Sequence, residues 1–159
     1  MTITTAGPAL AGKDPQSLVD PETFDRLARH FAARQQVTLN YAERTLGQLL
    51  IFLKAHADGL RNDPDFGMLL PTGESYRVVP TAPVDAAWHA CLQNTEPYAA
   101  ACHAIAGGFV HHRPILTEEM SNGTAKMYTI KALADTGYAI DMEFWDGEAE
   151  SCCPPNPGV

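Results

Sequence analysis

The segment between Thr38 and Gly59 constrains the fold more than any other part of the chain. Thr38 is a typical helix N-cap, and Gly59 is a natural stop at the other end. Between them lie apolar residues at helical spacing: Tyr41, Ala42, Leu46, Leu49, Leu50, Phe52 and Leu53. A stripe this wide predicts one long helix that forms the central rod of the core.

Four shorter helices are predicted around this rod. Asp20-Pro21 is typical of an N-cap followed by proline in the first helical position, and it opens an amphipathic helix that runs to about Arg34. The other three are a helix opened by Pro83, a helix with Pro97 in its first turn that ends at Gly107-Gly108, and a helix from about Glu118 or Thr124 to Asp135. Residues 138–145 are expected to form a short strand or a final helical turn.

The predicted fold class is all-α, a single compact domain of about five helices. This helical domain covers residues 19–146, preceded by a flexible leader over 1–18 and followed by a flexible Cys/Pro-rich tail over 147–159. Glycine and proline punctuate residues 60–83, which predicts a long ordered loop with one possible edge strand at 76–80. Such a loop either carries binding residues or is a variable insertion.

Charge and hydropathy exclude two classes of partner. The net charge is −8 with only 11 basic residues, which argues against binding to a nucleic-acid backbone. No apolar run approaches the roughly 18 residues of a membrane span, and the N-terminus does not resemble a signal peptide, so we expect a cytoplasmic protein. The four cysteines are then thiols or metal ligands rather than disulfides. Cys152 and Cys153 in the tail are a further soft ligand pair, redox thiols, or residues without a role.

The chemistry-bearing residues gather between residues 85 and 112. Asp85 and His89 are four apart, so on a helix they share a face and form half of a metal site. The glycine pair that ends the fourth helix turns the chain back, which allows Cys102 and one of His111 or His112 to complete the site. Asp, His and Cys are ligands suited to a divalent transition metal such as zinc, iron or copper.

This ligand set predicts a metal-dependent tailoring enzyme that acts on a small molecule. The ion would serve as a Lewis acid, and Trp88, Tyr98 and Cys91 would lie at the pocket. The candidate metal ligands are His89, Cys102, His111 and His112, and the candidate catalytic residues are Asp85, His89 and Tyr98. The oligomeric state does not follow from the sequence.

Two alternatives stay open. In the first, the Asp/His/Cys/Trp cluster is a structural hydrogen-bond network, with Trp88 and Tyr98 in the core, and the protein is a non-catalytic interaction or regulatory module. In the second, Cys102 is the nucleophile of a Cys/His-dependent hydrolase or transferase that Asp85 orients. The second alternative requires a partly exposed thiol with a lowered pKa, whereas the apolar helical face predicts a buried one.

The same residues resemble a known bacterial family. The resemblance lies in Val84-Asp85-x-x-Trp88-His89, Thr95, Tyr98, Cys102 and Gly108-Phe109-Val110-His111-His112-x-Pro114, with weaker likeness at Ala132-Leu133, Gly137-Tyr138 and Phe144-Trp145. These motifs are similar to the glycine-rich domain-containing protein-like family, whose small members are mostly uncharacterised. The resemblance implies a shared fold and site over about residues 19–145, but no particular reaction. The chain departs from the family at Cys91 and Ala101, where relatives carry bulky aromatics, and at the 80–83 stretch, where they carry proline and serine.

Overall fold

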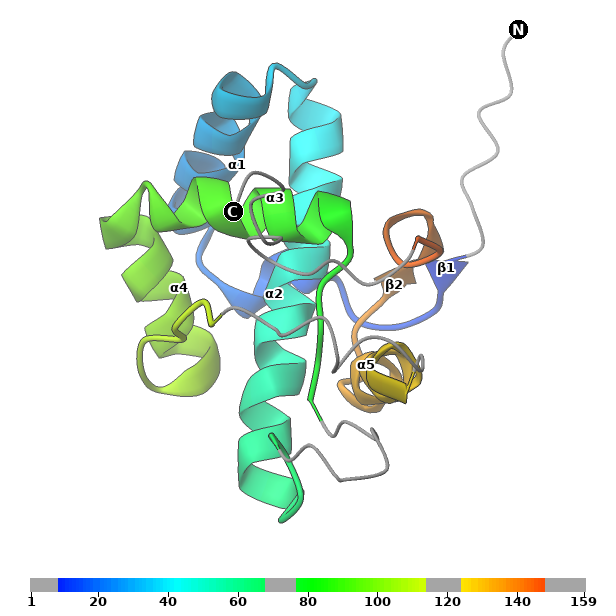
Figure 1. The fold of residues 1–159 in the computed structure, drawn as a ribbon. Coiled ribbons are helices and arrows are strands. Elements are labelled where there is room, and N and C mark those ends of the chain that lie inside the picture. Colours follow the sequence, from blue (N-terminus) through cyan, green and yellow to red (C-terminus); the bar gives the residue numbers. More distant parts are fainter. Residues whose placement is uncertain (1–8, 68–76, 114–123, 148–159) are drawn as a thin grey trace, which may run out of the picture.

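The computed structural model describes residues 9–67, 77–113 and 124–147, and this part of the chain is a bundle of five α-helices (Figure 1). The helices are α1 (Pro21–Gln35), α2 (Leu39–Asn62), α3 (Ala82–Leu92), α4 (Thr95–Ala106) and α5 (Thr124–Asp135). Two-residue strands β1 (Ala9–Leu10) and β2 (Ile140–Asp141) and the 3₁₀ helices η1 (Pro15–Leu18) and η3 (Met142–Phe144) complete it. The all-α prediction is confirmed.

Helix α2 is the centre of the bundle. It packs against each of the other four α-helices, and Figure 1 shows it running through the middle, with α3 crossing it and α4 and α5 on opposite sides. Every residue from 45 to 53 is buried, so this stretch is enclosed on all faces. Fully burying a Leu or Phe side chain contributes about 1.5–3 kcal/mol. The predicted central rod is therefore the core of the protein.

The N-terminal ends of α1 and α2 follow from their capping residues. Asp20 Oδ1 accepts a hydrogen bond from the backbone N–H of Thr23 at 2.9 Å. Thr38 Oγ1 accepts one from the backbone N–H of Tyr41 at 3.2 Å. Each bond satisfies an N–H group that the helix itself leaves without a partner. Both predicted helix starts are confirmed.

The C-terminal end of α2 differs from the prediction. The helix continues through Gly59 to Asn62, and Gly59 is not among the described residues with positive φ. A Cβ atom at Gly59 would lie 2.3 Å from Cδ2 of Phe66, which is closer than atoms can approach. Gly59 therefore does not end the helix, and its missing side chain leaves the space that the Phe66 ring occupies. The backbone N–H of Asp63 donates to Gly59 O at 2.9 Å and closes the last turn.

The described part of the leader, residues 9–18, is fixed to the C-terminal part of the bundle. Strand β1 pairs antiparallel with β2, and the backbone N–H of Lys13 donates to Gly137 O at 3.0 Å. Gly12 allows this approach, because a Cβ there would lie 2.6 Å from the Tyr138 carbonyl carbon. Residues 9–13 are thus paired with the chain at 137–141, and the flexible leader over 1–18 stays a prediction. The region 138–145 contains both predicted alternatives, a short strand and a helical turn.

The remaining loop and tail predictions fall largely on residues outside the described ones. Residues 77–80 form no strand, so the described part of the expected edge strand is absent. Residues 1–8, 68–76, 114–123 and 148–159, with Cys152 and Cys153 among them, lie outside the described residues. Within the described ranges, no helix is both long enough and apolar enough to cross a membrane.

Candidate metal centre and its pocket

Helix α3 places Asp85 and His89 on one face, as their spacing predicts. Asp85 lies in the first turn of α3 and is only 7% exposed. His89 lies one turn later, with 46% of its side chain exposed, and its Nε2 is 3.5 Å from Asp85 Oδ2. The carboxylate is thus held inside the fold, while the imidazole stands at the surface above it.

His112 reaches these two residues from the segment that follows α4. The Tyr98 hydroxyl on α4 donates to Val110 O at 2.5 Å and accepts from Trp88 Nε1 at 2.8 Å, which ties the returning chain to α3. The His112 ring then lies against Trp88, with ring centroids 4.3 Å apart. This anchoring fixes which of the two adjacent histidines turns toward Asp85.

The three side chains converge on one point. His112 Nε2 is 2.9 Å from Asp85 Oδ1 and 3.2 Å from His89 Nε2. One ligand atom from each residue lies within 4.8 Å of the other two. For bonds of about 2.0–2.1 Å, two ligand atoms of one ion lie about 2.9 Å apart at a right angle and about 3.4 Å apart at a tetrahedral angle. The observed separations fit a transition-metal ligand set.

Asp85 can accept a hydrogen bond from each imidazole, because His112 Nε2 lies 2.9 Å from Oδ1 and His89 Nε2 lies 3.5 Å from Oδ2. A neutral imidazole nitrogen carries either one proton or one lone pair. Nε2 of His112 therefore cannot donate to Asp85 and accept from His89 at once. A cation at the centre would instead accept a lone pair from each of the three residues, so the same donor set can hold either an ion or protons.

Cys102 and His111, two predicted ligands, are not part of this group. Cys102 is fully buried on α4, and its surroundings include the Tyr98 hydroxyl and the Val110 backbone. His111 is exposed, and its ring lies tilted against that of Phe109 with centroids 5.0 Å apart. Neighbouring residues of an extended segment point in opposite directions, which separates His111 from His112. The half-site of Asp85 and His89 that their spacing predicted is thus joined by His112, and the thiol stays outside the group.

The buried thiols do not resemble nucleophiles. Burial raises the pKa of Cys91 to about 12 and raises the pKa of Cys102 above its usual range. A reactive cysteine needs the opposite, a lowered pKa and access to solvent. Cys91 is also absent from the pocket wall, where it was expected. Both residues fill the interior between α3 and α4 as small apolar side chains.

Tyr98 is also placed differently from a catalytic residue. Its side chain is 1% exposed, and its hydroxyl is used by Trp88 and Val110. Burial raises the pKa of Tyr98, so the phenol stays protonated and keeps donating to the Val110 carbonyl. Tyr98 therefore positions the wall of the site.

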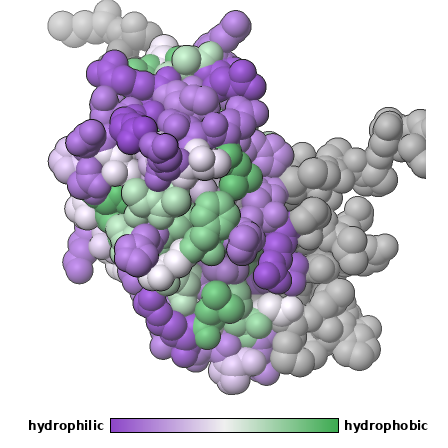
Figure 2. All heavy atoms as spheres, turned by 90° about the vertical axis from the view of Figure 1, so that its left-hand side faces the viewer, coloured by the Kyte–Doolittle hydropathy of each residue, from purple (hydrophilic) through white to green (hydrophobic). Residues whose placement is uncertain are grey.

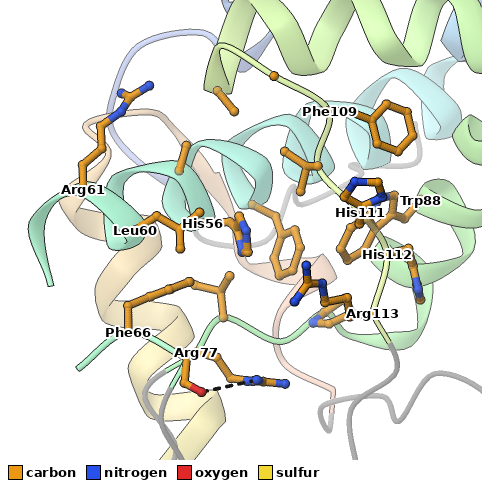
Figure 3. A pocket seen from close by; sticks show the side chains of 18 residues that line it. His56, Leu60, Arg61, Phe66, Arg77, Trp88, Phe109, His111, His112 and Arg113 are labelled. Atoms are coloured by element: carbon orange, nitrogen blue, oxygen red, sulfur yellow. Dashed lines mark hydrogen bonds between the residues drawn. The ribbon is translucent and has the colours of Figure 1, made fainter. Parts of the chain in front are cut away.

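A pocket of about 630 Å³ adjoins the three converging residues, and His112 and Trp88 belong to its wall (Figure 3). Its other walls come from the C-terminal half of α2, from residues 66–67 and 77–80, and from residues 106–113. Among the described residues, the lining includes three arginines, Arg61, Arg77 and Arg113, and no acidic residue. Sequence reasoning missed these arginines because they are distant in the chain and no local motif joins them.

The arginines affect the ionisation of His56, a histidine on α2 that also lines this pocket. Burial lowers the pKa of His56, and the positive charges of Arg113 and Arg77 lower it further. The ring of His56 packs edge-on against Phe66, with centroids 5.2 Å apart. His56 is therefore neutral in the folded protein at neutral pH, and the pocket's positive charge resides on its arginines.

Comparison with known proteins adds no relative. No family model matches the chain, and no curated protein or solved structure is significantly similar to it. The resemblance to the glycine-rich domain-containing protein-like family stays a prediction from the motifs.

Proposed function

We propose that this protein binds one divalent transition-metal ion through Asp85, His89 and His112 and uses it on a small molecule in the adjoining pocket. The observation that carries the proposal is the convergence of two imidazole nitrogens and one carboxylate oxygen within 4.8 Å of one another. Two nitrogens and one oxygen are the borderline donors that zinc, iron and copper accept.

The three ligands would leave room for a substrate. Structural metal sites are usually closed by four protein ligands, whereas catalytic sites keep at least one position open. His89 is half exposed, and His112 forms part of the pocket wall, so an open position would face both solvent and pocket. The ion would act there as a Lewis acid that polarises a bound oxygen atom.

This chain's own residues would supply the rigidity that such a site needs. Trp88 backs the His112 ring, and the Tyr98 hydroxyl holds the backbone two residues before it. Supporting contacts of this kind fix the orientation of ligating rings and raise metal affinity. The class of enzyme that fits is a metal-dependent tailoring enzyme for small molecules.

A non-catalytic module is the second candidate, favoured by the buried chain of hydrogen bonds from Trp88 through Tyr98 to Val110. In that case a hydrogen bond between His112 Nε2 and Asp85 Oδ1, 2.9 Å apart, would extend this network. A satisfied buried network specifies packing without any bound ion. Such a protein would stay free of metal and keep its stability in chelator.

The test is metal binding by untagged protein, measured by elemental analysis and by titration with Co²⁺ after chelation. We expect about one equivalent in the wild type and a loss of at least tenfold in affinity in His89→Ala. His89 is suited to this test because its side chain is half exposed, so its removal leaves the core intact.

His111→Ala is the matched control, since His111 is one residue from His112 but lies outside the converging group. It should bind Co²⁺ as the wild type does, and circular dichroism should show all three proteins folded. A folded wild type that takes up no metal would overturn the proposal, and so would an equal loss of affinity in the control.

A further inference from the structure

We propose that the pocket beside the candidate metal centre binds an organic anion, a molecule with a flat apolar body and a carboxylate group that pairs with Arg113. The inference deepens the proposed function by naming its substrate class. The inference rests on the proposed function in one respect, the placement of the bound anion beside a metal ion.

The charge of the pocket is opposite to that of the protein. The whole chain carries −8, yet the pocket wall, as far as the structure describes the chain, contains three of the 11 basic residues and no Asp or Glu. An acidic protein that gathers arginines around one cavity attracts anions there and repels them elsewhere. Guanidinium groups match carboxylates in particular, because both are planar and form two parallel hydrogen bonds.

Arg113 is the arginine best placed to hold the anion. Figure 3 shows its side chain extending from the wall beside His112 into the pocket, and its charge is felt by His56 on the facing helix. Among the described residues, no ion pair involves Arg113 or Arg61, whereas other arginines, such as Arg29 and Arg44, pair with carboxylates. Arg77 Nη2 donates to Gly67 O at 3.4 Å, so that group has a partner already.

The rest of the wall fits an apolar, flat body. Aromatic side chains contribute to it from four parts of the chain: Phe52, Phe66, Trp88 and Phe109. Leu60 and Phe109 are 64% and 45% exposed, two of the three large hydrophobic residues that stand out at the described surface, and both belong to this pocket. Figure 2 shows apolar residues gathered on the face that carries α4, with hydrophilic residues around them. Exposed apolar surface of this kind marks binding sites.

The size of the pocket sets the size of the ligand. At about 630 Å³ it falls within the range of roughly 300–1,000 Å³ that small-molecule sites occupy. One or two fused rings with a carboxylate fit such a volume. His112 and Arg113 both line the pocket, so a ligand whose carboxylate pairs with Arg113 would share this pocket with one of the proposed metal ligands.

The experiment compares an acid with its neutral counterpart, 2-naphthoate with 2-naphthamide, by isothermal titration of the full chain in the presence of chelator. The two probes have the same ring body, so the ratio of their affinities reports the charge alone. We expect the acid to bind at least tenfold more tightly. In Arg113→Gln this preference should fall about tenfold while naphthamide binding stays unchanged.

Arg29→Gln is the control, because Arg29 lies on α1 and does not line the pocket. Its side chain is 65% exposed, so the substitution should not disturb the core. It should keep the wild-type preference for the acid. Equal affinity for acid and amide in the wild type would overturn the proposal, as would an unchanged preference in a folded Arg113→Gln protein.

Repeating the titration with metal-loaded protein separates the two proposals. An acid preference in chelator, in a protein that takes up no metal, would support the anion pocket and overturn the metal centre. Metal uptake by a protein that binds acid and amide equally well, both in chelator and with metal, would support the metal centre and overturn the anion pocket. Chelator removes the possibility that the carboxylate binds only to an ion.

Discussion

A single hydroxyl group joins three elements around the site. Tyr98 on α4 accepts from the indole of Trp88 on α3 and donates to the carbonyl of Val110. All three residues are buried, so none of these polar atoms has water as a substitute partner. The position of His112, two residues after Val110, depends on this one oxygen atom.

Tyr98→Phe should therefore destabilise the fold and loosen the site. The substitution leaves the Trp88 N–H and the Val110 carbonyl without a hydrogen-bond partner, which costs about 1–3 kcal/mol of folding free energy for each group. Urea unfolding should show a loss of about 2–4 kcal/mol, and metal affinity should fall with it. Tyr41→Phe is the control, since no described hydrogen bond uses the Tyr41 hydroxyl, and it should change stability by less than about 0.5 kcal/mol. Equal effects of the two substitutions would contradict this role of Tyr98.

His56 gives the stability of the protein a specific dependence on pH. Its pKa in the fold lies below the ordinary value of 6.5, so between these two values the unfolded chain binds more protons than the folded one. The stability due to neutral His56 is complete above about pH 6.5 and is lost as the pH falls toward the lowered pKa.

This dependence should be visible as a difference between two proteins. From about pH 7.5 to about pH 5.5, denaturant unfolding should show a larger loss of stability for the wild type than for His56→Gln, which has no group to protonate at that position. Parallel losses in the two proteins would mean that other groups account for the pH dependence.

At the scale of the elements, the end of α2 forms one wall of the pocket through a glycine. Gly59 lets the ring of Phe66 lie directly against the helix backbone, and Phe66 in turn lines the pocket and packs against His56. A glycine inside a helix costs roughly 0.5–1 kcal/mol relative to alanine. Here that cost accompanies a close contact that no other residue permits.

Gly59→Ala should thus destabilise the protein despite the better helix propensity of alanine. The new methyl group would lie 2.3 Å from Cδ2 of Phe66 and force the ring out of its seat. In a Phe66→Ala background the obstacle is gone, and the same change should stabilise the helix by roughly 0.5–1 kcal/mol. A double-mutant cycle in urea measures this reversal of sign. A stabilising effect in both backgrounds would show that the ring relocates without cost.

At the scale of the whole molecule, local sequence signals predicted the helices but not the tertiary contacts between them. Asp20 and Thr38 cap helices through neighbours three residues away, and the apolar stripe of α2 has a regular period, so both could be found in the sequence. The shared face of Asp85 and His89 follows from spacing alone. Spacing alone does not show that His112, rather than His111, faces Asp85, because this depends on where Tyr98 holds the chain after α4.

The errors do not all have the same origin. Cys102 was predicted to be a ligand although its apolar helical face indicated a buried thiol, and the structure buries it. Arg61 and Arg113 meet at one pocket from elements far apart in the chain. Strand β1 is two residues long, too short for any periodic pattern to mark it, whereas its partner β2 lies within the region where a short strand was expected.

The pairing of Ala9 with Asp141 sets an order of events during synthesis of the chain. A ribosome delivers the N-terminal residues first, at about 5–20 residues per second. Helices α1 to α4 pack against one another, and they can do so while synthesis continues. Strand β1, although made before all of them, has no partner until β2 has emerged. The first described segment of the chain is therefore among the last to find its place, and it closes the fold behind the helices.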